Sequence, residues 1–247
     1  MKPKQIAKKL WAKLQNHFFG LLGFDYISLY KVNRRNDLKE IGSRYGSWVV
    51  PSTLIDANSV CYCVGCGEDI SFDLGLIEYF SCDVFAFDPT PRAISYVEKV
   101  AGQNPKYHFF EVGLWDKEDT LKFYVPRNIE HVSHSLVNLQ KTDEYIVVKV
   151  KRLKDIMNEI GHKKIDLIKI DIEGAEYKVI DSIIEDGIKV KVICVEYDEY
   201  FNQLDSNYKN RIRYSISKLL SAGYLLIYAQ GNGNYTFVKA APILDPC

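Results

Sequence analysis

Four carboxylates stand within eleven residues at positions 166–176, in the order Asp-Leu-Ile-Lys-Ile-Asp-Ile-Glu-Gly-Ala-Glu. The apolar run at 165–170 has the length and composition of a buried strand. Asp171 and Glu173 follow this run directly, and the carboxyl ends of strands are where open α/β folds bind ligands. A carboxylate at such an edge can take the proton of a reacting hydroxyl. Asp171 and Glu173 are therefore the first candidates for catalysis.

The same acids have a structural alternative. A helical pattern begins near residue 175, and acids in a first helical turn interact favourably with the helix dipole. Asp171 is also a good capping residue, and for Glu176 the structural role is the favoured one. Lys169, inside the buried run, needs a partner. Glu196, at the end of the next strand, could supply one or could reach the site itself.

Two histidines are further candidates for the proton acceptor. His131 and His134 lie in the loop 130–135, between polar residues. Histidine titrates near neutral pH and serves as a general base in many enzymes. Their alternative is a solvated loop, so His134 joins Asp171 and Glu173 as a catalytic candidate of lower rank.

The turn Gly65-Cys66-Gly67 separates an expected strand at 60–64 from an expected helix at 71–80. Glycine lets the backbone approach a ligand closely, and a helix N-terminus offers free N–H groups. Asp88 ends the next strand about 20 residues later, where a carboxylate can accept ribose hydroxyls; its alternative is a simple turn residue. These features predict a nucleotide-type cofactor. The residues expected to bind it are Gly65, Cys66, Gly67, Asp69, Ser71, Asp88, Pro89, Gly113, Leu114 and Asp171.

The cysteines do not form a metal-binding pattern. Cys61, Cys63 and Cys66 crowd onto one strand and its exit turn, unlike the paired knuckles of structural zinc. The same crowding argues against a disulfide framework, so reduced thiols are expected. A divalent cation held by Asp171, Glu196 or His134 is a minor alternative, and we expect no metal.

The elements that carry these residues alternate regularly from residue 60 onward. Strands are expected at 60–64, 84–87, 107–112, 165–170 and 190–195, with helices at 71–80, 91–101, 152–160, 175–185 and 207–221. Residues 115–150 resemble a hairpin insertion, and strands at 224–228 and 235–238 enclose an Asn/Gly turn. The pattern predicts an α/β fold: a doubly wound, Rossmann-like sheet, mostly parallel with a C-terminal antiparallel hairpin. Residues 21–58 allow no assignment.

Composition bounds the class of protein. The chain has 247 residues, 47% of them hydrophobic and 26% charged, as expected for one globular domain with additions. Lys+Arg and Asp+Glu are equal at 32 each, so no global charge argues for a nucleic-acid partner. No apolar run reaches the roughly 20 residues that span a bilayer, and no secretory signal pattern is recognisable. A cytoplasmic location is expected.

The N-terminal arm differs from the rest of the chain. Residues 1–35 hold eight lysines and arginines against one acid, and 3–20 show a basic amphipathic pattern with Trp11, Phe18 and Phe19. We expect an N-terminal helix and lead-in segment over 1–57 and the main domain over 58–247. The helix either packs on the domain edge or contacts anionic lipid, which would place the protein at the inner membrane surface.

Three of these stretches together resemble the FkbM family of S-adenosylmethionine-dependent methyltransferases. They are the acidic stretch 166–176, the run Phe-Asp-Pro-Thr-Pro at 87–91 and the turn 65–67. The resemblance covers about 58–240 and implies a seven-stranded methyltransferase sheet, S-adenosylmethionine as cofactor, and methyl transfer to a hydroxyl of a small-molecule or glycan acceptor. Many family members place an acid two residues before the first glycine, where this chain has Cys63. Asp69 or Asp171 would then replace that acid's contact with the methionine portion.

Two alternatives to O-methylation stay open. A nicotinamide-dependent oxidoreductase shares the glycine turn and the ribose acid, but Ile70 stands where its fingerprint has a third glycine. A catalytically silent glycan-binding or scaffold protein would keep the fold without the chemistry, and the intact acids Asp88, Asp171 and Glu173 argue against it. The sequence specifies neither the acceptor nor the oligomeric state.

Overall fold

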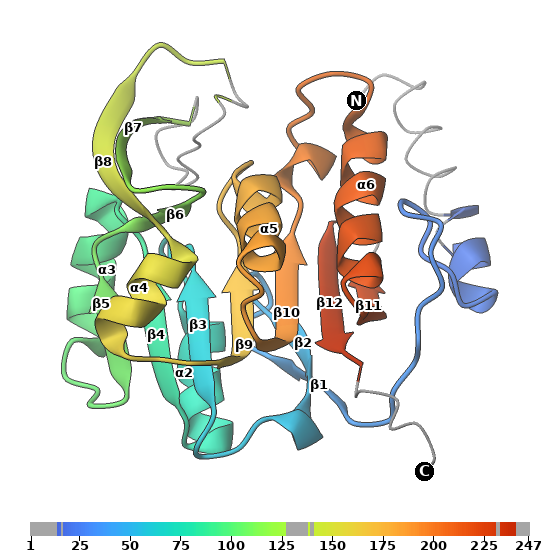
Figure 1. Ribbon diagram of the computed structural model, residues 1–247, viewed down its shortest axis with the longest axis horizontal. Helices are drawn as coiled ribbons and strands as arrows, with labels where there is room; N and C mark the ends of the chain where they lie inside the picture. The colour runs from blue at the N-terminus through green and yellow to red at the C-terminus, as the bar shows by residue number, and fades with distance from the viewer. Residues whose placement is uncertain (1–13, 16, 127–137, 139–140, 231–232, 241–247) are drawn as a thin grey trace.

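The structure is a computed structural model that describes residues 14–15, 17–126, 138, 141–230 and 233–240. Its centre is a seven-stranded sheet in the order β11-β12-β10-β9-β3-β4-β5 (Figure 1). Neighbours from β10 to β5 pair in parallel, and β12 runs antiparallel to both β10 and β11. The predicted fold class is therefore confirmed. The strands are β3 (Val60–Val64), β4 (Asp83–Phe87), β5 (Tyr107–Phe110), β9 (Ile165–Ile170), β10 (Val190–Glu196), β11 (Tyr224–Gln230) and β12 (Asn234–Lys239).

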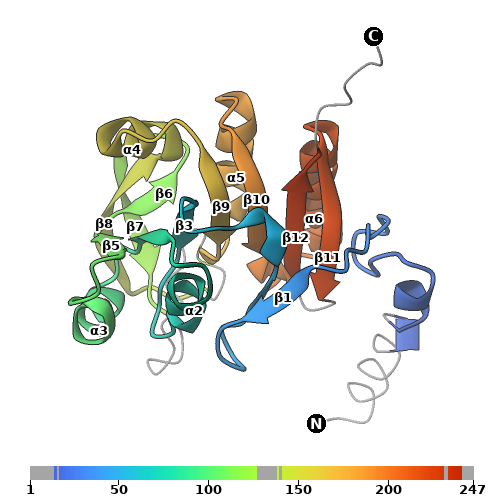
Figure 2. The ribbon, with the colours of Figure 1, turned by 90° about the horizontal axis from the view of Figure 1, so that it is seen from below.

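Helices cover both faces of this sheet (Figure 2). On one side lie α2 (Ser71–Phe80) and α3 (Pro91–Ala101); on the other lie α4 (Leu153–Ile160), α5 (Glu176–Glu185) and α6 (Tyr208–Ser221). Alternate residues of each strand therefore enter two different cores. Tyr62 of β3 packs with the α5 and α6 side, whereas Cys61 and Cys63 pack with the α2 and α3 side.

The expected strand at 107–112 is two residues too long. β5 ends at Phe110, because the chain turns there and the Val112 N–H donates to the Phe110 carbonyl. A new strand, β6 (Gly113–Trp115), then leaves the main sheet. It joins β7 (Asp119–Tyr124) and β8 (Tyr145–Arg152) in a separate three-stranded sheet of order β6-β8-β7. The β7 and β8 pair is antiparallel, as expected for the insertion, while β6 pairs with β8 in parallel.

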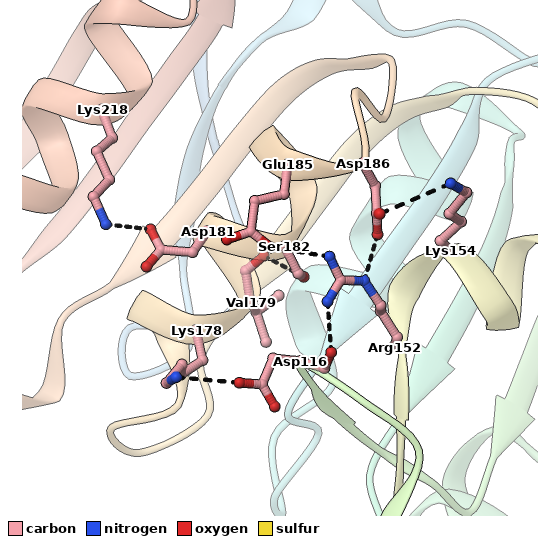
Figure 3. A network of polar contacts seen from close by, with 10 residues as sticks. All are labelled: Asp116, Arg152, Lys154, Lys178, Val179, Asp181, Ser182, Glu185, Asp186 and Lys218. Carbon is pink, nitrogen blue, oxygen red and sulfur yellow. Dashed lines mark hydrogen bonds and ion pairs between the residues drawn. The ribbon is translucent and has the colours of Figure 1, made fainter.

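Arg152 ties this small sheet to the C-terminal end of α5 (Figure 3). Its Nε donates to Asp186 Oδ2 at 2.6 Å, and its two terminal nitrogens donate to the Asp116 carbonyl at 2.6 Å and to Glu185 Oε2 at 3.1 Å. Lys154 and Lys178 add ion pairs to Asp186 and Asp116. Because Gly113 and Leu114 begin β6, this network also fixes two of the predicted cofactor residues.

We expect Arg152→Ala to lower the free energy of unfolding by about 2 to 3 kcal/mol, since a guanidinium that bridges two segments is lost. Urea unfolding followed by circular dichroism measures this change. Lys178→Ala is the matched control, because it removes an exposed ion pair from the same network and should cost less than about 1 kcal/mol. Equal losses in the two variants would show that Arg152 contributes only surface charge.

Residues 21–58, left unassigned by the sequence, contain the hairpin of β1 (Leu38–Ile41) and β2 (Trp48–Pro51), followed by the short helix η1 (Ser52–Leu54). This hairpin lies on the α2 side of the sheet, and Thr236 Oγ1 of β12 donates to the Val49 carbonyl at 2.7 Å. Of the helix expected over 3–20, the described residues 14, 15 and 17–21 are helical. Within the described part of the chain, no helix is long and apolar enough to cross a bilayer.

Candidate active site

A cavity of about 670 Å³ opens at the carboxyl ends of β3, β4, β9 and β10. Its volume falls within the range of roughly 300 to 1,000 Å³ that small-molecule sites occupy. The cavity brings together most of the residues that the sequence predicted for the cofactor and for catalysis. Those that line it are Gly65, Cys66, Gly67, Asp69, Asp88, Pro89, Gly113, Leu114, Asp171 and Glu173.

Of the other predicted residues, one lies outside the cavity lining and one is not described. The Ser71 hydroxyl oxygen accepts the Ser43 N–H at 2.7 Å, outside the cavity lining. Asp69 accepts the Ser43 hydroxyl and the Ser71 N–H, so these three residues join the hairpin turn to the start of α2. His134, like His131, lies outside the described residues.

The glycine turn is pressed against the end of β9. Gly65 and Gly67 both have positive φ angles, +85° and +52°, a region that side chains disfavour. A Cβ on Gly65 would collide with the Asp171 carbonyl oxygen. The Gly65 N–H donates to the Phe87 carbonyl at 2.9 Å, so the turn is also fixed to β4. Glycine is therefore required at position 65 by both conformation and space.

Asp88 holds this turn in place. Its Oδ2 accepts the N–H groups of Cys66 and Gly67 at 2.9 and 3.1 Å, and its Oδ1 accepts the N–H and hydroxyl of Thr90 at 2.9 and 2.6 Å. A carboxylate has about four acceptor positions, so these bonds use them fully. The Thr90 hydroxyl thus bonds Asp88 and makes no capping hydrogen bond to α3. That Asp88 binds ribose stays a prediction.

We expect Asp88→Asn to weaken binding of S-adenosylhomocysteine by about 10- to 100-fold, because an amide NH₂ would face N–H donors that now reach a carboxylate. Calorimetric titration measures this loss. Asp56→Asn is the control, since Asp56 also accepts a backbone N–H in a turn but lies at an exposed position away from the cavity. Unchanged affinity and stability in Asp88→Asn would remove Asp88 from the site's framework.

Lys169 lies under the glycine turn with only 5% of its surface exposed. Its ammonium donates to the Gly65 carbonyl oxygen and lies 3.4 Å from Asp171 Oδ2. Burial by itself would lower the pKa of Lys169, but the charges of Asp171 and Asp73 outweigh it and raise that pKa. The ion-pair partner is therefore Asp171, and of the two roles open to Glu196 the structure shows the other one, since Glu196 lines the cavity.

The loop after β9 has an unusual backbone. Glu173, with φ +51°, and Gly174, with φ +99°, are both left-handed. Such a conformation costs free energy for a residue with a side chain and occurs often at functional sites. Glu176 Oε1 accepts the Gly174 N–H at 2.8 Å, and burial raises the pKa of Glu176 to about 7. Glu176 thus supports the loop, while Asp171 and Glu173 face the cavity.

Several lining residues were missed by sequence reasoning. The turn between β1 and β2 contributes residues 44–47, β2 contributes Trp48, and the segment after β10 contributes Asp198, Phe201 and Asn202. Gln230 and Asn234 come from the ends of β11 and β12. Only Asn234 carried a usable signal, since it adjoins the predicted turn of the C-terminal hairpin. The hairpin at 38–51 reaches the cavity through long-range packing that no local pattern reveals.

The cysteines that the structure describes form no disulfides. Cys61, Cys63, Cys66, Cys82 and Cys194 are all buried and free. In the described part of the chain, no group of three or more His, Cys, Asp or Glu residues has a geometry that could hold a metal ion.

Comparison with known proteins assigns the family. The model of the methyltransferase FkbM domain matches residues 65–226. The 2-O-methyltransferase NoeI of Sinorhizobium fredii is 28% identical over 165 residues, which are 61% of this chain and 68% of NoeI. The human probable methyltransferase-like protein 24 is 28% identical over 128 residues, 51% of this chain and only 28% of that protein. Among solved structures, precorrin-6y C5,15-methyltransferase of Geobacter metallireducens aligns with a TM-score of 0.42 at 12% identity, covering 76% of this chain and 87% of that one. The FkbM domain match at 65–226 includes the glycine turn, the acidic loop and the sheet between them, and by this match the chain belongs to the FkbM family of methyltransferases.

Proposed function

We propose that the protein transfers a methyl group from S-adenosylmethionine to a hydroxyl oxygen of a sugar or glycan. The observation that carries this proposal is that the glycine turn at 65–67 and the acidic loop after β9 line one and the same cavity. The similarity to NoeI, a 2-O-methyltransferase, supports transfer to oxygen. A cofactor and an acceptor would meet between these two walls.

The lining fits a positively charged cofactor. Asp171, Glu173, Glu196 and Asp198 surround the side of the cavity near β9 and β10, and Lys169 beneath them is engaged by Asp171 and the Gly65 carbonyl. S-adenosylmethionine supplies a methyl group on a sulfonium, a good leaving group. The chain's task is then to align the acceptor oxygen and to remove its proton. Asp69 or Asp171 would hold the methionine portion in place of the acid missing at Cys63.

The acceptor side of the cavity suits a sugar. Tyr45 and Phe201 line it with 91% and 55% of their surfaces exposed, so their rings are available to stack on a sugar face. The amides of Asn202, Gln230 and Asn234 can bond hydroxyl groups in both directions. Asp171, Glu173 and His134 remain the sequence-based candidates for the base, and the ion pair with Lys169 favours a positioning role for Asp171.

Calorimetric titration with S-adenosylhomocysteine, NAD and NADP tests the proposal. We expect micromolar binding of S-adenosylhomocysteine and none of the nicotinamide cofactors. Binding of NAD or NADP alone would establish the oxidoreductase alternative. Binding of none of the three, with retention of oligosaccharides on an affinity column, would establish a silent glycan-binding protein.

We also propose that the N-terminal segment contacts anionic lipid on the cytoplasmic face of a membrane. Leu14, Phe18, Leu21 and Leu22 are exposed by 57% to 71%, next to the lysines of the sequence. We expect flotation with phosphatidylglycerol vesicles at low salt, weakened at high salt and abolished by Phe18→Glu with Leu21→Glu. Tyr214→Glu, at an equally exposed site on α6, is the control. Absence of flotation at low salt would leave the segment only a packing role.

A further inference from the structure

Glu196 occupies a central place at the rim of the cavity. It is the last residue of β10, beside the end of β9, where Val195 pairs with Ile170. On its other side it pairs with Asn234 of the antiparallel strand β12. Glu196 and Asn234 both line the cavity, as does Asp171, which follows β9. Sheet order thus brings Glu196 next to the acidic loop.

Glu196 differs from its neighbours in its bonding. Asp88 and Asp69 accept hydrogen bonds, Asp73 accepts the Tyr107 hydroxyl at 3.0 Å, and Asp171 pairs with Lys169. Among the residues that the structure describes, none donates a hydrogen bond to the Glu196 carboxyl group or forms an ion pair with it. A carboxyl group at a cavity wall with its oxygens unused is available to a ligand.

A second buried carboxyl group lies at the same wall. Asp198 lines the cavity with 5% of its surface exposed, and its carboxyl group hydrogen-bonds that of Glu176, which requires a proton between the two. Unlike Glu196, Asp198 therefore has a partner within the protein. Acid groups gathered in this way attract positive charge.

The charges around Glu196 oppose its ionisation. Burial, followed by the charges of Asp171 and Glu173, raises the pKa of Glu196 to about 9, while Lys169 acts in the other direction. Glu196 therefore holds a proton at neutral pH, and a positive charge placed beside it would favour release of that proton. The titratable groups that face it from the surrounding segments are Lys169, Asp171, Glu173, Glu176, Asp198 and Tyr45.

We infer that Glu196 loses its proton when the positively charged cofactor enters the cavity, and that the carboxylate so formed is the base for the acceptor hydroxyl. This inference rests on the proposed function. In the transfer, the acceptor oxygen bonds the methyl carbon as the carbon–sulfur bond breaks, with its electron pair left on sulfur. The hydroxyl proton moves to Glu196. Before the cofactor binds, the proton on Glu196 keeps this group of acidic residues from carrying a further unbalanced negative charge.

Comparing S-adenosylmethionine with S-adenosylhomocysteine tests the inference, because the two share the amino acid portion and differ in the sulfonium charge. We expect S-adenosylmethionine binding at pH 7.5 to release about one proton more than S-adenosylhomocysteine binding, measured calorimetrically in buffers of different ionisation enthalpy. The ratio of the two affinities should rise about tenfold per pH unit from about pH 7 to pH 8.5 and level off above the pKa of about 9.

Variants of Glu196 test whether this residue releases the extra proton. Glu196→Gln should abolish the extra proton release and make the ratio of the two affinities independent of pH. Glu196→Asp should keep both the extra release and the pH dependence. Glu98→Gln, exposed on α3 and outside the cavity, should behave as the unmodified protein. Release that persists in Glu196→Gln would overturn the assignment in favour of Asp198 or Glu176. A pH-independent ratio in the unmodified protein would overturn it without any variant, and failure of both ligands to bind would overturn the proposed function instead.

Discussion

Gly65→Ala should abolish measurable binding of S-adenosylhomocysteine, a loss of more than about 100-fold. Two separate effects add at this position. The backbone has φ +85°, which a residue with a Cβ adopts at a cost of about 1 kcal/mol or more. In addition, the new methyl group would collide with the Asp171 carbonyl oxygen, so β3 and β9 would have to separate at the cavity. Calorimetric titration and urea unfolding of the same sample measure the two consequences.

Gly187→Ala separates these effects. Gly187 also has a positive φ, +60°, but an added Cβ there meets nothing within 4 Å. We expect this control to lose about 1 kcal/mol of stability and to bind S-adenosylhomocysteine normally. If Gly65→Ala were to bind as tightly as Gly187→Ala does, the turn at 65–67 would not form the cofactor wall.

Lys169→Met should lower the free energy of unfolding by about 3 to 5 kcal/mol, the usual loss when one member of a buried charge pair is removed. The methionine would fill much of the space but leave Asp171 and Asp73 without their cation and the Gly65 carbonyl without its donor. The glycine turn would lose a contact at the same time, so cofactor affinity should fall together with stability. Urea unfolding and calorimetric titration measure these changes.

Lys106→Met is the matched control for this prediction. Lys106 also donates to a backbone carbonyl, that of Ser81, and lies 4.0 Å from an aspartate, Asp83, but it is exposed. Its loss should cost less than about 1 kcal/mol. The double variant Lys169→Met with Asp171→Asn should recover part of the loss, because one uncompensated charge is removed with the other. Equal effects of Lys169→Met and Lys106→Met would show that the buried cation contributes no more than a surface one.

The elements that carry the site follow from local patterns in the sequence. The apolar runs at 60–64 and 165–170 became β3 and β9 with the expected bounds, and Pro91–Ala101 became α3. Strand and helix periodicity, together with glycine and proline positions, depend on residues close in sequence. Because parallel strands place their carboxyl ends at one edge, the sequence also predicted that Gly65, Asp88 and Asp171 would meet.

Only the tertiary structure decided how the residues brought together at this edge are hydrogen-bonded and charged. The hairpin at 38–51 reaches the cavity, Asp88 bonds the glycine turn, and Lys169 pairs with Asp171, each through packing between segments distant in sequence. The pairing of Glu196 with Asn234 depends on the reversed strand β12, and the protonation of Glu196 depends on burial beside Asp171 and Glu173. Periodicity specifies which face of an element is apolar, but burial, partners and pKa values arise only once remote segments exclude water from the same space.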